Sequence, residues 1–222
     1  MGAVSTPRLD VGALMRVGPV IAVLTIERAA DAAALARALT TGGVKVLEVT
    51  LRTSEALAAI AAIAREVPEA IVGAGTVLNP HDLERAEHAG AQFAVSPGLT
   101  EPLIRAASKS ALPFLPGVAT ASDMMRGLDA GLEHFKFFPA EAAGGAAAMK
   151  ALHGPFPRCR FCPTGGITPT NAGAYLALPN VLCVGGAWLA PADAIAAGDW
   201  ARITDLARAA GTGPGTASLA AR

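Results

Sequence analysis

The sequence has few cysteines and no long apolar run, and both shortages exclude classes of protein. Its 222 residues include 3 cysteines, which are too few for a disulfide framework. Because the number is odd, they cannot all pair with one another. No window of about 18 uncharged apolar residues is present, and the N-terminus lacks the basic and apolar regions of a secretory signal. We therefore expect no membrane span and a cytoplasmic location.

Net charge is also absent, because 18 basic residues balance 18 acidic ones. No long-range field then favours nucleic acid or an anionic membrane as a partner, and a small-molecule substrate is the better expectation. The four histidines, at positions 81, 88, 134 and 153, are scattered and form no pair at zinc-ligand spacing. The sequence therefore predicts neither a bound metal nor a cofactor.

One short cysteine motif, Cys159-x-x-Cys162, lies in a segment that alternates like a strand. Residues three apart on a strand point to opposite faces, so these two thiols are poorly placed to chelate a metal or to bond to each other. We interpret them as structural thiols, and a metal-binding or redox pair is the alternative.

What the sequence does contain is a repeated alternation of β-type runs and alanine-rich helical stretches. A helical stretch follows each of eight β-type runs, at 20–26, 44–51, 70–77, 91–98, 112–120, 133–140, 160–166 and 181–189. Alternating strands and helices predict a parallel sheet, and eight such units predict an α/β fold of one closed (β/α)8 TIM barrel. The alternative is an open doubly wound sheet, which more often has about five or six strands.

A single domain fits the length, since barrels of this type commonly run to roughly 200–250 residues. We expect a short helix within 1–18 at the barrel bottom, the barrel over 19–210 and a flexible tail over 211–222. Glycines in the C′ position, one residue beyond the helix C-cap, are expected at Gly42, Gly90 and Gly131.

Alternation places two opposite charges inside this barrel. Along the second run Glu48 lies on the face opposite Leu47 and Val49, and along the sixth run Lys136 lies opposite the flanking phenylalanines. A buried salt bridge is the structural explanation, but ionised groups in a core are costly, and apolar replacements are often neutral or better. Function therefore explains the pair better. A lysine that loses hydration favours its neutral, nucleophilic amine, which suits imine chemistry.

Two glycine-rich turns follow the last two runs, at 163–167 and 184–187. In barrels the loops after strands seven and eight commonly bind phosphate through backbone amides, although glycines also serve plain tight turns. Arg52 follows the run of Glu48, where a guanidinium can hold a substrate carboxylate, or can simply be solvated. Thr76 and Pro97 end the third and fourth runs.

Seven motifs, in order, resemble the 2-keto-3-deoxy-6-phosphogluconate (KDPG) / 4-hydroxy-2-oxoglutarate (KHG) aldolase family: LEVTLRT, GAGTVLNP, QFAVSPGLTEPL, PGVAT, FKFFPAE, FCPTGGIT and VLCVGGAWL. The resemblance spans about Gly18 to Ala210. It implies a metal-free class I lyase, typically a homotrimer, that cleaves KDPG to pyruvate and glyceraldehyde 3-phosphate, and also KHG to pyruvate and glyoxylate.

Residue by residue, the resemblance implies that Lys136 forms the Schiff base and that Glu48 is the acid/base. It implies that the carboxylate, the pyruvyl group and the distal phosphate end are held by Arg52, Thr76, Pro97, Phe138, Thr164, Gly165, Gly166 and Gly186. The sequence departs from the family at Ala187, where the usual motif GGSWL has a serine that contacts phosphate. Loss of that hydroxyl makes an aldolase mainly for non-phosphorylated 2-keto-4-hydroxy acids the alternative.

Two other functions fit parts of the pattern. A phosphosugar isomerase or epimerase could use Glu48 as its base, but it leaves the inward Lys136 unexplained. A barrel that only senses a phosphorylated metabolite would need no more than the glycine turns.

Overall fold

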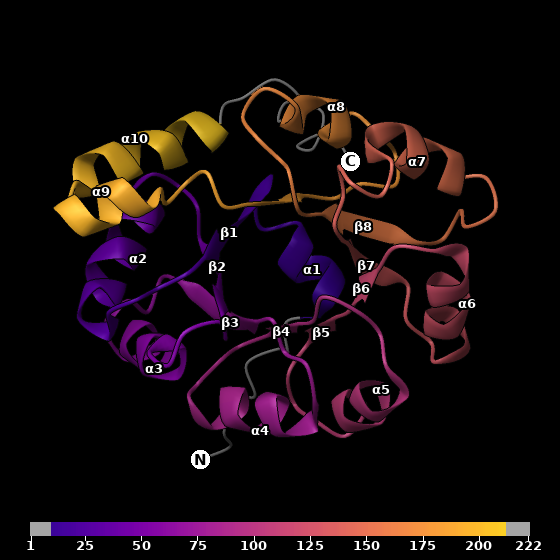
Figure 1. The fold of residues 1–222 in the computed structure, drawn as a ribbon, viewed down its shortest axis with the longest axis horizontal. Coiled ribbons are helices and arrows are strands. Elements are labelled where there is room, and N and C mark those ends of the chain that lie inside the picture. The colour runs from indigo at the N-terminus through magenta and orange to yellow at the C-terminus, as the bar shows by residue number, and fades with distance from the viewer. Residues whose placement is uncertain (1–9, 212–222) are drawn as a thin grey trace, which may run out of the picture.

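Parallel strands occupy the middle of the molecule and helices surround them (Figure 1). The computed structural model describes residues 10–211. Its strands are β1 Val20–Leu24, β2 Val46–Thr50, β3 Ile71–Gly75, β4 Ala94–Val95, β5 Phe114–Leu115, β6 Gly117–Val118, β7 His134–Phe137, β8 Arg160–Pro163 and β9 Val184–Gly186. Its helices are α1 Val11–Met15, α2 Ala32–Thr41, α3 Ala56–Glu66, α4 Pro80–His88, α5 Glu101–Ala107, α6 Ala121–Asp129, α7 Gly145–Leu152, α8 Ala172–Leu176, α9 Ala192–Ala197 and α10 Trp200–Gly211, with a 3-10 turn η1 at Ala29–Asp31.

The strands form a curled parallel sheet of six, in the order β5-β4-β3-β2-β1-β9, and a second parallel sheet in the order β6-β7-β8. Parallel bridges, Phe161 to Val181 and Thr164 to Gly185, link β8 to the segment of β9. The α/β alternation predicted from the sequence is confirmed. The expected fifth run is divided into β5 and β6 at Pro116, which has no N–H to donate, although its carbonyl accepts from Lys136 N at 2.8 Å.

Side-chain alternation divides the core into two parts. Leu47 and Val49 of β2 belong to the larger part, between strands and helices, whereas Val46 belongs to an inner cluster. Leu14 and Met15 of α1 complete that inner cluster. Since α1 also lies against His134, the first residue of β7, it covers the amino ends of the strands, as expected of the N-terminal helix.

The helix ends agree with the sequence at two of three glycines. Gly90 and Gly131 have φ of 87° and 77° directly after the caps of α4 and α6, which confirms them. The expectation for Gly42 is wrong by one residue: Gly42 has φ −77°, and Gly43 takes the left-handed conformation at 97°. Most of the expected tail, 212–222, and residues 1–9 lie outside the described part. Within 10–211 no helix is long and apolar enough to span a membrane.

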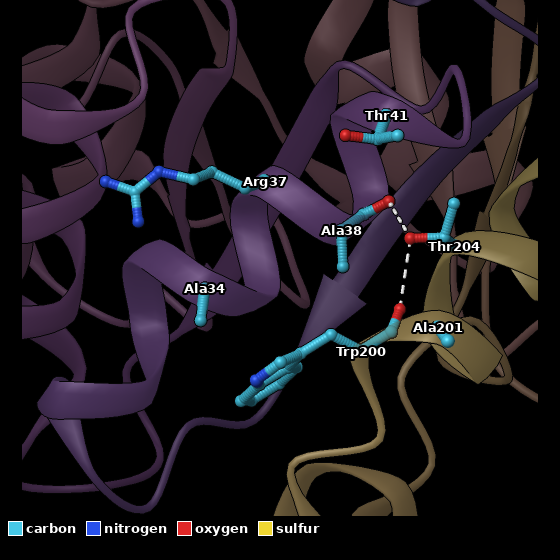
Figure 2. A pocket seen from close by; sticks show the side chains of 7 residues that line it. All are labelled: Ala34, Arg37, Ala38, Thr41, Trp200, Ala201 and Thr204. Carbon is cyan, nitrogen blue, oxygen red and sulfur yellow. Dashed lines mark hydrogen bonds between the residues drawn. The ribbon is translucent and has the colours of Figure 1, made fainter.

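The last helix, α10, packs on α2 near the start of the described chain. Thr204 Oγ1 lies 3.0 Å from the carbonyl oxygens of both Ala38 and Trp200, to which it can donate. Beside this contact is a hollow of about 340 Å³, shown in Figure 2, lined by Ala34, Arg37, Ala38, Thr41, Trp200, Ala201 and Thr204. None of the predicted site residues lines it, so we interpret it as a packing feature of the two helices.

The same contact depends on Gly42. A Cβ there would collide with Ala207 Cβ and lie 2.6 Å from Thr204 O. We predict that Gly42→Ala lowers the free energy of unfolding by about 1–3 kcal/mol, the usual cost of overpacking. Gly18→Ala is the matched control, because a Cβ at Gly18 meets nothing within 4 Å. Urea denaturation gives the free energy of unfolding of both variants. Equal values for the two would contradict the tight α2–α10 contact.

Candidate active site

The structure brings Glu48 of β2 and Lys136 of β7 together, although the two strands belong to different sheets. Lys136 Nζ donates to Glu48 Oε1 at 2.9 Å across 88 residues of sequence. Glu48 on β2 is 2% exposed and Lys136 on β7 is 4% exposed, so the ion pair is almost withdrawn from water. A short hydrogen-bonded pair of this kind can pass a proton between its members, which is what an amine nucleophile and its acid/base require.

Neighbouring residues shape the space around this pair. A Cβ on Gly75, at the end of β3, would collide with the carboxylate of Glu48, so only glycine leaves it room. Lys136 Nζ lies 5.2 Å from the centre of the Phe138 ring, within range of a cation–π contact. Thr50 Oγ1 donates to Leu24 O at 2.9 Å, which ties β2 to β1. The pair is therefore held from several strands at once.

Three further predicted residues follow the carboxyl ends of neighbouring strands. Arg52 comes two residues after β2, is exposed, and makes no hydrogen bond or ion pair within residues 10–211. Thr76 follows β3 directly and, among the described residues, is the one non-glycine with positive φ, at 58°. Such strained backbone often marks a functional position. Pro97 is half-buried just after β4.

The two glycine turns lie side by side. A parallel bridge pairs Thr164 with Gly185, so the turn after β8 adjoins the turn at the end of β9. Gly165 and Gly166 have φ of 98° and 77°, a conformation that side chains other than glycine rarely adopt. Ala187 is exposed immediately beyond β9. The two turns thus adjoin each other at the carboxyl ends of β8 and β9, and β8 is the strand that pairs with the Lys136 strand β7.

The sequence interpretation missed a contact behind the first glycine turn. The hydroxyl of Tyr175, on α8, donates to Glu141 Oε1, three residues beyond Phe138. Burial raises the pKa of Tyr175, and the hydrogen bond to the Glu141 carboxylate adds to the increase. Tyr175 is the single tyrosine of the chain, but no sequence pattern places it against a residue 34 positions away.

Of the three cysteines, Cys162 lies beside the predicted site, because its Sγ is 3.8 Å from Thr164 Oγ1 and its strand position pairs with Lys136. Cys159 and Cys162 are free and belong to different parts of the core, as expected of opposite strand faces. Cys183 contacts Cys162, and this hydrogen bond, with burial, raises the pKa of the Cys183 thiol. His134 is only half-buried, its side chain makes no hydrogen bond to the described residues, and burial lowers its pKa. The residues described contain no cluster of three or more potential metal ligands.

Comparison with known proteins gives one family. The family model described as KDPG and KHG aldolase matches residues 11–206. The chain is 59% identical over 197 residues to the KHG/KDPG aldolase of Escherichia coli K12, covering 89% of this chain and 92% of that protein.

Solved structures give the same result. A KDPG aldolase of Legionella pneumophila, with pyruvate captured as a covalent carbinolamine, matches with a TM-score of 0.89 and 49% identity over 90% of this chain and 98% of that one. The KDPG aldolase of Zymomonas mobilis ZM4, solved with 3-phosphoglycerate, matches with a TM-score of 0.88 and 52% identity over 94% and 99%. The resemblance seen in the sequence is confirmed, and the chain belongs to the KDPG and KHG aldolase family.

Proposed function

We propose that this chain is a class I aldolase that cleaves KDPG to pyruvate and glyceraldehyde 3-phosphate through a Schiff base on Lys136, and that it also cleaves KHG to pyruvate and glyoxylate. The observation that carries the proposal is the buried hydrogen bond of 2.9 Å between Lys136 Nζ and Glu48 Oε1. The covalent pyruvate carbinolamine in the Legionella relative supports the same chemistry, since a carbinolamine precedes an imine.

The first half of the cycle builds the imine. A proton passes from the Lys136 ammonium to the Glu48 carboxylate across their hydrogen bond, which leaves a neutral amine. The amine attacks the C2 carbonyl carbon of the substrate, and the attacking nitrogen, which is now cationic, passes a proton to the carbonyl oxygen, so that a neutral carbinolamine forms and Glu48 stays protonated. Glu48 then protonates that hydroxyl as water leaves, and the product is a cationic imine that can accept an electron pair.

The second half breaks the carbon–carbon bond. Glu48, directly or through one water, accepts the proton of the C4 hydroxyl, and the C3–C4 electron pair moves into the imine. The aldehyde leaves, and a pyruvyl enamine remains on Lys136. Protonation at C3 followed by hydrolysis releases pyruvate and restores the amine. One carboxylate serves every transfer, which is why its position against Nζ matters most.

The roles of the surrounding residues follow from the family resemblance. Arg52, exposed and unpaired within the described chain, and Thr76 hold the pyruvyl carboxylate. Pro97 and Phe138 line the pyruvyl group. The distal hydroxyl and phosphate end is held by Thr164, Gly165, Gly166 and Gly186, with the amides of Gly165 and Gly166 as backbone donors. The 3-phosphoglycerate bound by the Zymomonas relative supports a site for a phosphorylated three-carbon unit.

The alternatives differ in what they leave unexplained. An isomerase or epimerase has no use for a buried lysine at 2.9 Å from its base, and neither has a metabolite sensor. An aldolase mainly for non-phosphorylated acids is favoured by one observation, the absence of a hydroxyl at Ala187. The backbone amides of Gly165 and Gly166 still favour an anion without it, so KDPG is the main substrate of this proposal.

We also propose that the two sheets close into one (β/α)8 barrel. Pro116 alone separates β5 from β6, so the pair counts as one strand, and the bridges of Phe161 and Thr164 join β8 to the segment of β9. Domain boundaries at 18 and 210, a homotrimer, a cytoplasmic location and the lack of a metal or cofactor remain predictions.

The proposed function is tested first at the nucleophile. We predict that Lys136→Met lowers cleavage of KDPG and KHG by about three orders of magnitude or more, because it removes the amine but keeps an unbranched side chain. The rate of cleavage is measured as the steady-state rate of pyruvate release. Lys150→Met, the same change on the exposed face of α7, is the matched control and should retain full activity. Substantial cleavage by the Lys136 variant would refute the assignment.

A second prediction concerns the proton carrier. Glu48→Gln should fold, since the amide oxygen can still accept from Lys136, yet turnover should fall by about two or more orders of magnitude. Glu55→Gln, a partly buried carboxylate that accepts only from Ala29 N at 3.3 Å, is the control and should leave turnover unchanged. Turnover of Glu48→Gln near that of wild type would mean that Glu48 is only an ion-pair partner.

A third prediction concerns the missing hydroxyl. A hydrogen bond to a charged group contributes roughly 1.5–3 kcal/mol, so Ala187→Ser should raise kcat/KM for KDPG by about one to two orders of magnitude. KHG has no phosphate to reach this turn and serves as the internal control. An equal gain on both substrates, or no change in their ratio, would show that position 187 does not contact phosphate.

A further inference from the structure

The Gly165–Gly166 turn is held in place from behind by a side chain that has no assigned role. Glu141 N donates to Gly165 O at 3.1 Å, and Ala140 N donates to Thr164 O at 2.8 Å. These two bonds fasten the segment after the Lys136 strand to the turn after β8. The nucleophile and the proposed phosphate turn are therefore connected through one short stretch of backbone.

The Glu141 side chain itself lies against the turn. A Cβ added to Gly166 would be 2.6 Å from Glu141 Cγ and 2.7 Å from Glu141 Cβ, so the two residues are packed as closely as glycine permits. Gly166 has φ of 77°, a conformation that residues other than glycine rarely adopt, so a side chain at this position would disturb both the backbone and the contact with Glu141. Movement of the Glu141 side chain would release the amides of this turn from their present positions.

Tyr175 fixes that side chain. Glu141 is exposed and could take many conformations in water, but its Oε1 accepts a hydrogen bond from the hydroxyl of Tyr175, which is 1% exposed. A buried phenol has few conformations, so its hydroxyl is a rigid anchor for a mobile carboxylate.

The same helix holds the other side of the turn. Asn171, the N-cap of α8, donates from Nδ2 to Gly166 O at 3.0 Å and accepts at Oδ1 from Thr168 N at 2.8 Å. Helix α8 thus holds Gly166 through Asn171 directly and through Tyr175 and Glu141 indirectly. The backbone donors of the turn are aligned before any ligand arrives, and such preorganisation raises affinity for an anion.

We propose that Tyr175 and Glu141 are positioning residues for the Gly165–Gly166 turn, and that together they set the preference of this site for a phosphorylated over a non-phosphorylated substrate. The proposal rests on the proposed function, because it assumes that this turn receives the phosphate. Neither residue touches the reacting atoms, so the effect falls on binding of the distal end of the substrate and leaves the chemistry at Lys136 intact.

The experiment compares Tyr175→Phe, Glu141→Ala and the double variant on KDPG and on KHG. We expect each single variant to raise KM for KDPG by roughly 10-fold, with kcat and both constants for KHG within about 2-fold. Because the residues act as one unit, the double variant should be no worse than the more affected single variant. Equal effects on both substrates, unchanged KM values or additive losses would overturn the proposal.

A matched control separates positioning from loss of stability. Leu176→Val reduces packing of the buried neighbour of Tyr175 on α8 but leaves the hydroxyl and Glu141 in place. Its ratio of KM values for the two substrates should equal that of wild type, and a shifted ratio would count against the proposal. If wild type itself fails to cleave KDPG, the proposed function is wrong. If wild type cleaves both substrates and the variants change nothing, only this inference fails.

Discussion

The chemistry proposed for this protein depends on one ion pair that water hardly reaches. Lys136 and Glu48 are 4% and 2% exposed and are joined at 2.9 Å. Removing two charges from water is costly, and well-packed apolar residues often stabilise a core at least as well. The pair therefore contributes little net stability, and its chemistry is the better explanation for it. A proton that can move between two buried partners gives an amine the neutral form that imine formation requires.

Several features of the fold determine where that ion pair lies. Strand alternation directs Glu48 inward while Leu47 and Val49 pack on the helices, and Gly75 leaves the space that the carboxylate fills. At the other end of the strands α1 covers the inner cluster. Exposed Arg52 and the glycine turns follow the carboxyl ends of their strands, and in the proposed function the substrate approaches the amine from that end.

The sequence predicted the local features well and the long-range contacts poorly. Period-two alternation was enough to put Glu48 and Lys136 on inner faces, because strands direct successive side chains to opposite sides. The sequence prediction failed at two details of the backbone. Pro116 divides the expected fifth strand into two, and Gly43 rather than Gly42 takes the left-handed conformation. Contacts such as Tyr175 with Glu141 join residues 34 apart, and no local pattern specifies which of them meet.

The central claim, that Lys136 is the nucleophile, is tested most directly by chemical trapping. Wild-type protein is incubated with pyruvate and sodium borohydride, digested, and the reduced adduct is located by mass spectrometry. A reduced imine is a stable secondary amine, so its position records which lysine attacked. We expect a pyruvyl adduct on Lys136. An adduct on Lys45, Lys109 or Lys150 instead, or no adduct in protein that cleaves KDPG, would contradict the account.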